Sequence, residues 1–184
     1  MCFRKREVKL LKKILVTGPP GSGKSFLATK VIEKVRGKGL KVGGVITPEV
    51  REGGTRKGFL IVDLLTGEDA VMAKVGEGSP KVGKYVVDTS SIASLGVRAL
   101  ERAIEEADVI VVDEIGKMEL LVEDFAQVIR DALKCGKPFL GTIGMKLNHP
   151  LAQELKMRRD VELVFLSRDK WQEKYEYVLR ELGI

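Results

Sequence analysis

The chain has 184 residues, a formal net charge of +6, 44% hydrophobic residues and 32% charged residues. This length is typical of one domain, and this composition excludes a disordered chain or one embedded in a membrane. The apolar runs are far shorter than the roughly 20 residues of a membrane span, and no apolar signal segment follows the basic start. We therefore expect a single domain over residues 1–184, a monomer in the cytoplasm with no membrane partner.

Most of the positive charge lies at the start of the chain. Residues 1–13 hold six basic residues against Glu7, which gives five of the six net charges. We treat residues 1–12 as a basic N-terminal extension. Such a run is usually a solvated tail, although a basic patch also binds nucleic acid. Cys2 and Cys135 lack metal-ligand spacing and predict neither a zinc site nor a disulfide, which fits a reducing compartment.

Strands and helices are predicted to alternate along the chain. The apolar runs predict strands at 13–17, 42–47, 85–87, 108–113, 138–143 and 162–166. The helical spacing of apolar residues predicts helices at 24–36, 90–106, 121–134, 149–158 and 169–182. Ser90 or Ser91 is expected to cap the second helix. Extended segments 59–65 and 69–75, separated by Thr66-Gly67-Glu68, predict an antiparallel hairpin around residues 58–75. The pattern indicates an α/β fold.

A phosphate-binding motif follows the first strand and opens the first helix. The sequence Gly18-Pro19-Pro20-Gly21-Ser22-Gly23-Lys24-Ser25 matches G-x-x-x-x-G-K-[ST]. The glycines let backbone N–H groups point at the β-phosphate, and the helix N-terminus adds a positive dipole end. We expect Lys24 to reach the β- and γ-phosphates and the Ser25 hydroxyl to bind Mg²⁺. We count Phe26, the next residue, with the nucleotide-binding segment.

Two acidic residues end the buried strand 108–113. Asp113 and Glu114 follow four β-branched residues, at the carboxyl end of a strand, where open α/β sheets bind ligands. We expect Asp113 to serve the metal with Ser25, and Glu114 to act as general base on an attacking water. Both acids are therefore counted with the nucleotide site. The alternative is that they only end a strand and begin a loop.

Further candidates depend on position alone. Lys117 is a candidate for neutralising γ-phosphate charge, or else a surface lysine. Arg56 and the pair Arg158-Arg159 are candidate arginine fingers, although exposed arginines are common. Thr142 either contacts the γ-phosphate or attacking water, or bonds to the backbone.

Two groups of residues predict structure rather than chemistry. His149, before Pro150, is expected to cap or pack a helix. Trp171, Tyr175 and Tyr177 are expected to pack the terminal helix.

These motifs together resemble a known family. They are similar to the small P-loop nucleoside-triphosphatases, a family found in thermophilic bacteria and archaea and also in animals, as the cancer-related nucleoside-triphosphatase. The resemblance spans nearly the whole chain and depends on Gly18–Ser25, Gly58-Phe59, Asp113–Glu119, Thr142-Ile143 and His149-Pro150.

The resemblance implies a three-layer RecA-like fold with a mostly parallel central sheet. It implies slow Mg²⁺-dependent hydrolysis of several nucleoside triphosphates, ATP and GTP among them, with broad base tolerance. It assigns phosphate binding to Gly18–Ser25, the metal to Ser25 and Asp113, and the role of base to Glu114, with Lys117 as its helper and modest support for Arg56. Because we expect Lys24 to reach the β- and γ-phosphates, we count it as catalytic too. The basic extension and the segment 144–148, where a more charged loop is expected, depart from the family pattern.

Two other functions fit the same motifs. A nucleotide or small-molecule kinase shares the length, the loop and the sheet, and Lys156–Arg159 lies where its arginine-bearing lid would be. An acceptor screen distinguishes it. A nucleotide-dependent switch or nucleic-acid accessory protein would use residues 1–13, and predicts salt-sensitive binding that is lost with them.

Overall fold

A ten-stranded mixed sheet forms the centre of the protein in the structure, a computed structural model that describes residues 13–184. The strand order is β10-β1-β9-β8-β2-β4-β5-β7-β6, with β3 paired to β4. The parallel strands are β1 (Lys13–Gly18), β2 (Val42–Ile46), β8 (Val109–Ile115), β9 (Phe139–Gly144) and β10 (Val161–Phe165). The basic extension 1–12 lies outside the described residues.

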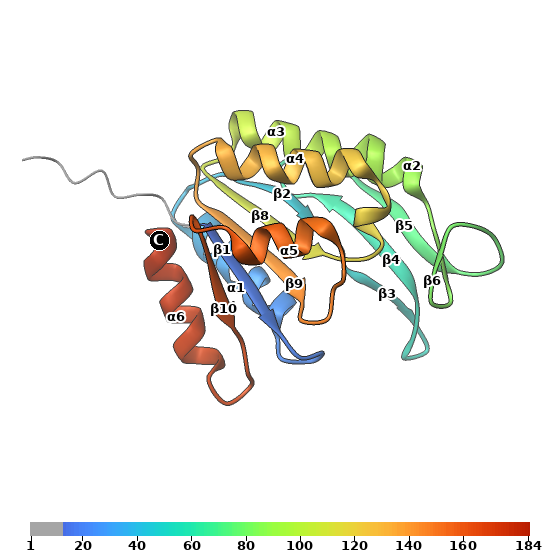
Figure 1. The fold of residues 1–184 in the computed structure, drawn as a ribbon, viewed down its shortest axis with the longest axis horizontal. Helices are drawn as coiled ribbons and strands as arrows, with labels where there is room; N and C mark the ends of the chain where they lie inside the picture. The colour runs from blue at the N-terminus through green and yellow to red at the C-terminus, as the bar shows by residue number, and fades with distance from the viewer. Residues whose placement is uncertain (1–12) are drawn as a thin grey trace, which may run out of the picture.

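The other half of the sheet is antiparallel. Its strands are β3 (Glu49–Glu52), β4 (Thr55–Asp63), β5 (Asp69–Val75), β6 (Lys81–Val82) and β7 (Tyr85–Val87). In Figure 1 they lie at the opposite end of the molecule from α6. The predicted hairpin is therefore confirmed as part of a larger antiparallel region.

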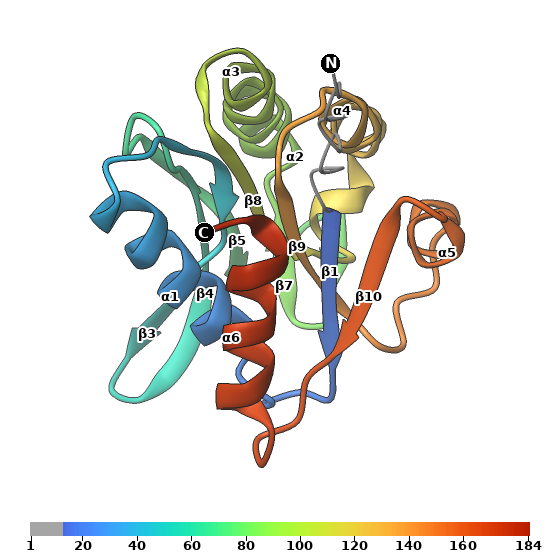
Figure 2. The same ribbon diagram turned by 90° about the vertical axis from the view of Figure 1, so that its left-hand side faces the viewer.

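Helices cover both faces of the sheet (Figures 1 and 2). Helices α1 (Lys24–Gly37) and α6 (Trp171–Leu182) pack on one face, in a cluster that includes Leu27, Val31 and Val178. On the other face lie α3 (Arg98–Glu106), α4 (Glu123–Lys134) and α5 (Pro150–Met157). The expected three-layer α/β fold is confirmed. Because β8 is covered on both sides, Val109–Val112 are all buried.

The second predicted helix differs in detail. It begins as α2 (Thr89–Ser91), continues through a π-helical turn at Ile92–Val97 and then becomes α3. The prediction that Ser90 or Ser91 caps it is wrong, because the Asp88 carboxylate accepts the Ser91 N–H at 3.1 Å. A carboxylate at this position suits the positive end of the helix dipole.

The parallel strands place the motifs at one edge of the sheet. In the pairing register, Gly18 of β1 lies opposite Gly144 of β9, and Asp113 of β8 lies opposite Ile46 of β2. These residues are at or near the carboxyl ends of their strands, as expected of ligand sites in such sheets. The phosphate-loop residues and the acidic residues therefore come together without any long connection.

Candidate nucleotide site

The loop between β1 and α1 is closely confined by the last strand and helix. Gly23 has φ +95°, and a Cβ there would lie 3.0 Å from the Trp171 ring. A Cβ on Gly18 would lie 2.4 Å from the carbonyl oxygen of Leu166. Glycine is therefore needed at both positions, at Gly23 by the left-handed backbone and at Gly18 by the close approach of a neighbouring chain segment.

Donor groups of this loop are available for an anion. The Lys24 ammonium donates to the carbonyl oxygens of Gly18, at 3.0 Å, and Pro19, at 3.2 Å. The Ser22 hydroxyl is buried and has no hydrogen-bond partner within residues 13–184. Buried polar groups in proteins are nearly always satisfied. A donor without a partner, beside a lysine at a helix N-terminus, therefore marks an anion site.

Asp113 lies directly against the start of α1. The Ser25 hydroxyl donates to Asp113 Oδ1 at 3.1 Å, and the Thr142 hydroxyl donates to the same oxygen. The Asp113 carbonyl oxygen accepts the Thr47 N–H at 2.7 Å. The peptide bond between Asp113 and Glu114 is cis. The structure thus brings Ser25, Asp113 and Thr142 together, with Thr142 bonded to a carboxylate rather than to the backbone.

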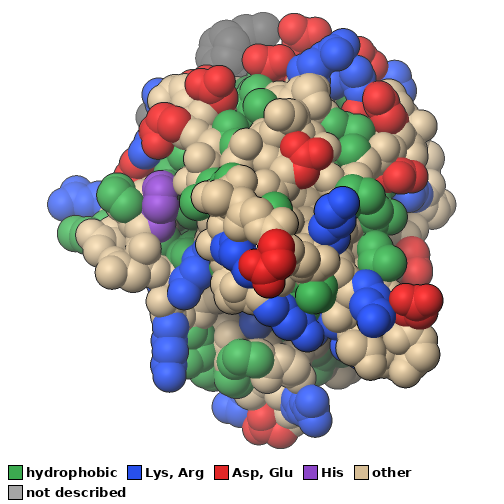
Figure 3. Space-filling model, turned by 90° about the vertical axis from the view of Figure 1, so that its right-hand side faces the viewer, with side chains coloured by type: hydrophobic (Ala, Val, Ile, Leu, Met, Phe, Trp, Pro, Cys, Tyr) green, Lys and Arg blue, Asp and Glu red, His purple; other side chains and the backbone are tan. Residues whose placement is uncertain are grey.

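A cavity of about 770 Å³ opens beside the loop. It runs from the loop toward the antiparallel end of the sheet, the end drawn in Figure 3, where blue basic side chains gather near the centre of the face. The polar and charged residues lining it are Lys24, Ser25, Thr47, Glu49, Arg56, Glu114, Lys117, Glu119 and Lys146. All four residues predicted to be catalytic, Glu114, Lys24, Lys117 and Arg56, therefore line one cavity.

Arg56 lies on β4 in a fixed setting. It forms an ion pair with Glu49 of β3, and its guanidinium lies 5.5 Å from the centre of the Phe59 ring. The Phe59 ring in turn meets Tyr85 edge-on at 5.2 Å. The Arg56 Nε is buried without a partner among the described residues. This arginine is consequently held in the cavity wall with one donor still free.

Burial controls the acidic groups of the cavity. It raises the pKa of Asp113, against the hydrogen bonds from Thr142 and Ser25 and the charge of Lys24. Burial, and then the charge of Asp113, also raise the pKa of Glu114. A third acid, Glu119, is 3% exposed, and burial raises its pKa to about 8. The negative charges are thus unfavourable until a positive group joins them.

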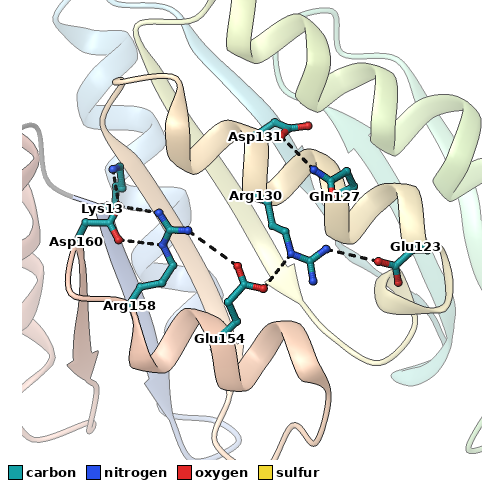
Figure 4. Close-up of polar contacts among 8 residues, drawn as sticks. All are labelled: Lys13, Glu123, Gln127, Arg130, Asp131, Glu154, Arg158 and Asp160. Carbon is teal, nitrogen blue, oxygen red and sulfur yellow. Dashed lines mark hydrogen bonds and ion pairs between the residues drawn. The ribbon is translucent and has the colours of Figure 1, made fainter.

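Other sequence candidates lie outside the cavity. Arg158 forms ion pairs with Glu154 and Asp160 (Figure 4), and neither it nor Arg159 lines the cavity. His149 Nδ1 accepts the Leu151 N–H at 3.1 Å, so its expected capping role is confirmed.

Two contacts to the loop were not predicted from the sequence. Arg168 Nε donates to the Gly21 carbonyl oxygen at 2.7 Å, and Trp171 Nε1 donates to that of Gly23 at 3.2 Å. Trp171 was expected only to pack its helix. Both residues lie almost 150 positions from the loop, and no local pattern links them to it. Glu119 belongs to the segment Asp113–Glu119 that resembles the family, but the sequence alone predicts no role for it.

The fold and site together define a P-loop nucleoside-triphosphatase. A family model described as NTPase matches residues 13–179, and the chain belongs to that family. It is 46% identical to the nucleoside-triphosphatase THEP1 of Methanocaldococcus jannaschii, over 71% of this chain and 77% of that protein. It is 38% identical to the protein of the same name from Korarchaeum cryptofilum, over 93% and 87% of the two chains.

Two solved structures agree. The crystal structure of THEP1 from Aquifex aeolicus matches with a TM-score of 0.83 at 31% identity, over 94% of this chain and 99% of that one. The solution structure of a human cancer-related nucleoside triphosphatase matches with a TM-score of 0.78 at 34% identity, over 92% and 96%. The chain is thus an enzyme that hydrolyses nucleoside triphosphates, as its motifs suggest. No helix among residues 13–184 is long and apolar enough to cross a membrane.

Proposed function

We propose that the enzyme hydrolyses several nucleoside triphosphates slowly, with Mg²⁺ and with Glu114 as the general base. The observation that carries this proposal is the setting of Glu114. It lines the same cavity as Lys24 and Ser25, and within residues 13–184 its carboxylate has no hydrogen-bond partner. Its oxygens are therefore available to orient and deprotonate a water at the γ-phosphate.

Ser25 and Asp113 are suited to hold Mg²⁺. The Ser25 hydroxyl and the Asp113 carboxylate, 3.1 Å apart, supply the hard oxygen ligands that this ion prefers. The raised pKa of the buried Asp113 also indicates a carboxylate that lacks enough positive charge around it. When bound, Mg²⁺ would neutralise phosphate charge in the transition state.

The phosphates would be held by the loop and by basic residues of the cavity. Lys24 would exchange the loop carbonyl oxygens for phosphate oxygens. Lys117 and Arg56 would approach the γ-phosphate from the cavity walls, where transition-state charge develops. Nothing in residues 13–184 or in the comparisons favours a kinase. We place the enzyme, as one domain, in the cytoplasm, where its free Cys135 thiol would stay reduced.

Phosphate release tests this proposal. With ATP, GTP, CTP and UTP, Glu114→Gln should bind nucleotide normally but turn over about 10²-fold more slowly or worse, because the amide cannot take a proton. Lys24→Ala should lose binding. The matched control Glu68→Gln changes an exposed glutamate between β4 and β5 and should behave as wild type. A Glu114→Gln variant as fast as wild type would remove Glu114 from the mechanism.

A further inference from the structure

The cavity indicates in which direction a nucleotide lies on the loop. Its lining includes Lys24, Glu114 and Lys117 but none of Gly21, Ser22 or Gly23. The γ-phosphate, where water attacks, belongs in the cavity beside Glu114. Ser25, in the first turn of α1, is the last residue of the loop segment that lines the cavity. With the γ-phosphate beside Glu114, the far end of the linear triphosphate can extend past Ser25, toward Phe26 and the start of α6.

An exposed aromatic ring lies on that side. Phe26 directly follows Ser25 and is 56% exposed, whereas Leu27, Ala28 and Val31 of the same helix are fully buried. A phenylalanine left in water forgoes the free energy of burial. Single exposed apolar residues are common in proteins, so exposure alone does not mark a site. The neighbours of Phe26 supply the stronger observation.

The Phe26 ring packs beside the loop against an aromatic residue of α6. The Trp171 ring lies 5.0 Å from it, tilted by 39°, and stacks on Tyr175 at 5.2 Å. Trp171 is fixed in turn by its hydrogen bond to the Gly23 carbonyl oxygen. Lys30 Nζ lies 5.5 Å from the Phe26 ring centre and pairs with the exposed Glu33 carboxylate at 2.7 Å, so a base that stacks on this face of the ring would displace the Lys30 side chain toward solvent.

We propose that Phe26, backed by Trp171, is the surface on which the nucleoside of the bound triphosphate stacks. Every nucleobase has an aromatic face, so stacking attracts all of them with little discrimination, in contrast to hydrogen bonds to base edges. This inference extends the proposed function, because it identifies a structural source of the broad base tolerance. It does not depend on which residue activates the water.

Isothermal titration calorimetry in the presence of Mg²⁺ tests the proposal, because it measures binding affinity without turnover. The probes are the non-hydrolysable imido analogues of ATP, GTP and UTP, together with inorganic tripolyphosphate, which has no base. Phe26→Ala should weaken all three analogues about tenfold and leave tripolyphosphate within about twofold of wild type. Phe26→Tyr keeps an aromatic face and should restore the affinity. The matched control Phe165→Ala removes a phenylalanine of β10 that is 54% exposed, and should change nothing.

Three other results would overturn the proposal. If Phe26→Ala weakens tripolyphosphate as much as the analogues, Phe26 supports the loop rather than the nucleoside. If no probe is affected, the nucleoside lies elsewhere. If only one base is affected, recognition is by the base edge. Failure of the proposed catalytic mechanism would appear instead as full activity of Glu114→Gln, which this titration does not measure.

Discussion

Glu119 is the residue whose setting is least expected for a charged side chain. A Cβ on Gly116 would lie 2.7 Å from Glu119 Oε2 and 3.0 Å from Glu114 Oε1, so the two carboxyl groups border the same narrow space. Burial, followed by the charges of Glu114 and Asp113, raises the pKa of Glu119 to about 8. The folded protein therefore holds the Glu119 proton to a higher pH than the unfolded chain does, next to the Glu114 side chain.

This raised pKa predicts how stability depends on pH. The unfolded chain releases the Glu119 proton near 4.5 and the folded protein near 8, so between these values the folded state binds more protons. The unfolding free energy contributed by Glu119 is then fully present below pH 4.5 and is lost as the pH rises through 8. Glu119→Gln, which carries no charge, should be markedly less sensitive to pH over this range.

Urea unfolding without Mg²⁺ at about pH 5.5 and about pH 8.5 measures the effect. Wild type should lose stability between the two values by more than Glu119→Gln does, and the exposed Glu68→Gln should follow wild type. Asp113 and Glu114 act in the same direction, so Glu119→Gln should keep part of the slope. An unchanged slope in Glu119→Gln would mean that Glu119 is already ionised in the folded protein.

Among the elements, the start of α5 offers a test of helix capping. His149 precedes Pro150, and its Nδ1 accepts the Leu151 N–H, one of the amides that a helix start leaves unpaired. His149→Ala should lower the unfolding free energy by about 1 kcal/mol, and His149→Asp should restore it because aspartate caps well. Turnover should not change, since His149 is not part of the cavity lining. Reduced turnover at unchanged stability would instead assign His149 a catalytic role.

The elements that were predicted most accurately from the sequence are those whose buried residues follow a regular pattern. Helix α4 was placed by its periodic apolar residues and β8 by its β-branched run. Strand β3 was missed because all four of its residues are exposed and show no alternation. The cap of α2 was misplaced by a few residues, because Asp88, Ser90 and Ser91 are all good capping residues and only the backbone distinguishes them.

In the nucleotide site, too, contiguous motifs were predicted and contacts between distant residues were not. Gly18–Ser25 and Asp113-Glu114 were predicted because each group is contiguous and each lies at a strand end. The contacts of Arg168 and Trp171 with the loop join residues 147 and 148 positions apart, so they depend on how β10 and α6 return beside β1. Such pairs follow from tertiary packing, and a single sequence contains no local pattern that indicates them.

Across the molecule, an ion-pair network joins elements on one side of the sheet (Figure 4). Lys13 of β1 pairs with Asp160 at 2.8 Å, and Asp160 pairs with Arg158 at 2.7 Å. Arg158 lies 4.0 Å from Glu154 of α5, which also binds Arg130 of α4 at 2.9 Å. Glu154, the central member, thereby links Arg130 of α4 to the cluster that Arg158 and Asp160 form with Lys13 of β1.

Removing the central charge tests whether this network acts as a unit. Glu154→Gln leaves Arg130 and Arg158 without their shared partner and should lower the unfolding free energy by about 1 kcal/mol or less, since these side chains are 21–38% exposed. The control Glu33→Gln breaks a more exposed pair with Lys30 that shares no residue with this network, and it should cost still less. The Glu154→Gln loss should shrink at about 1 M salt and grow with temperature, because the desolvation penalty of ion pairs falls on heating. If the loss of unfolding free energy in Glu154→Gln changes with neither salt nor temperature, it comes from packing of the Glu154 side chain rather than from its charge.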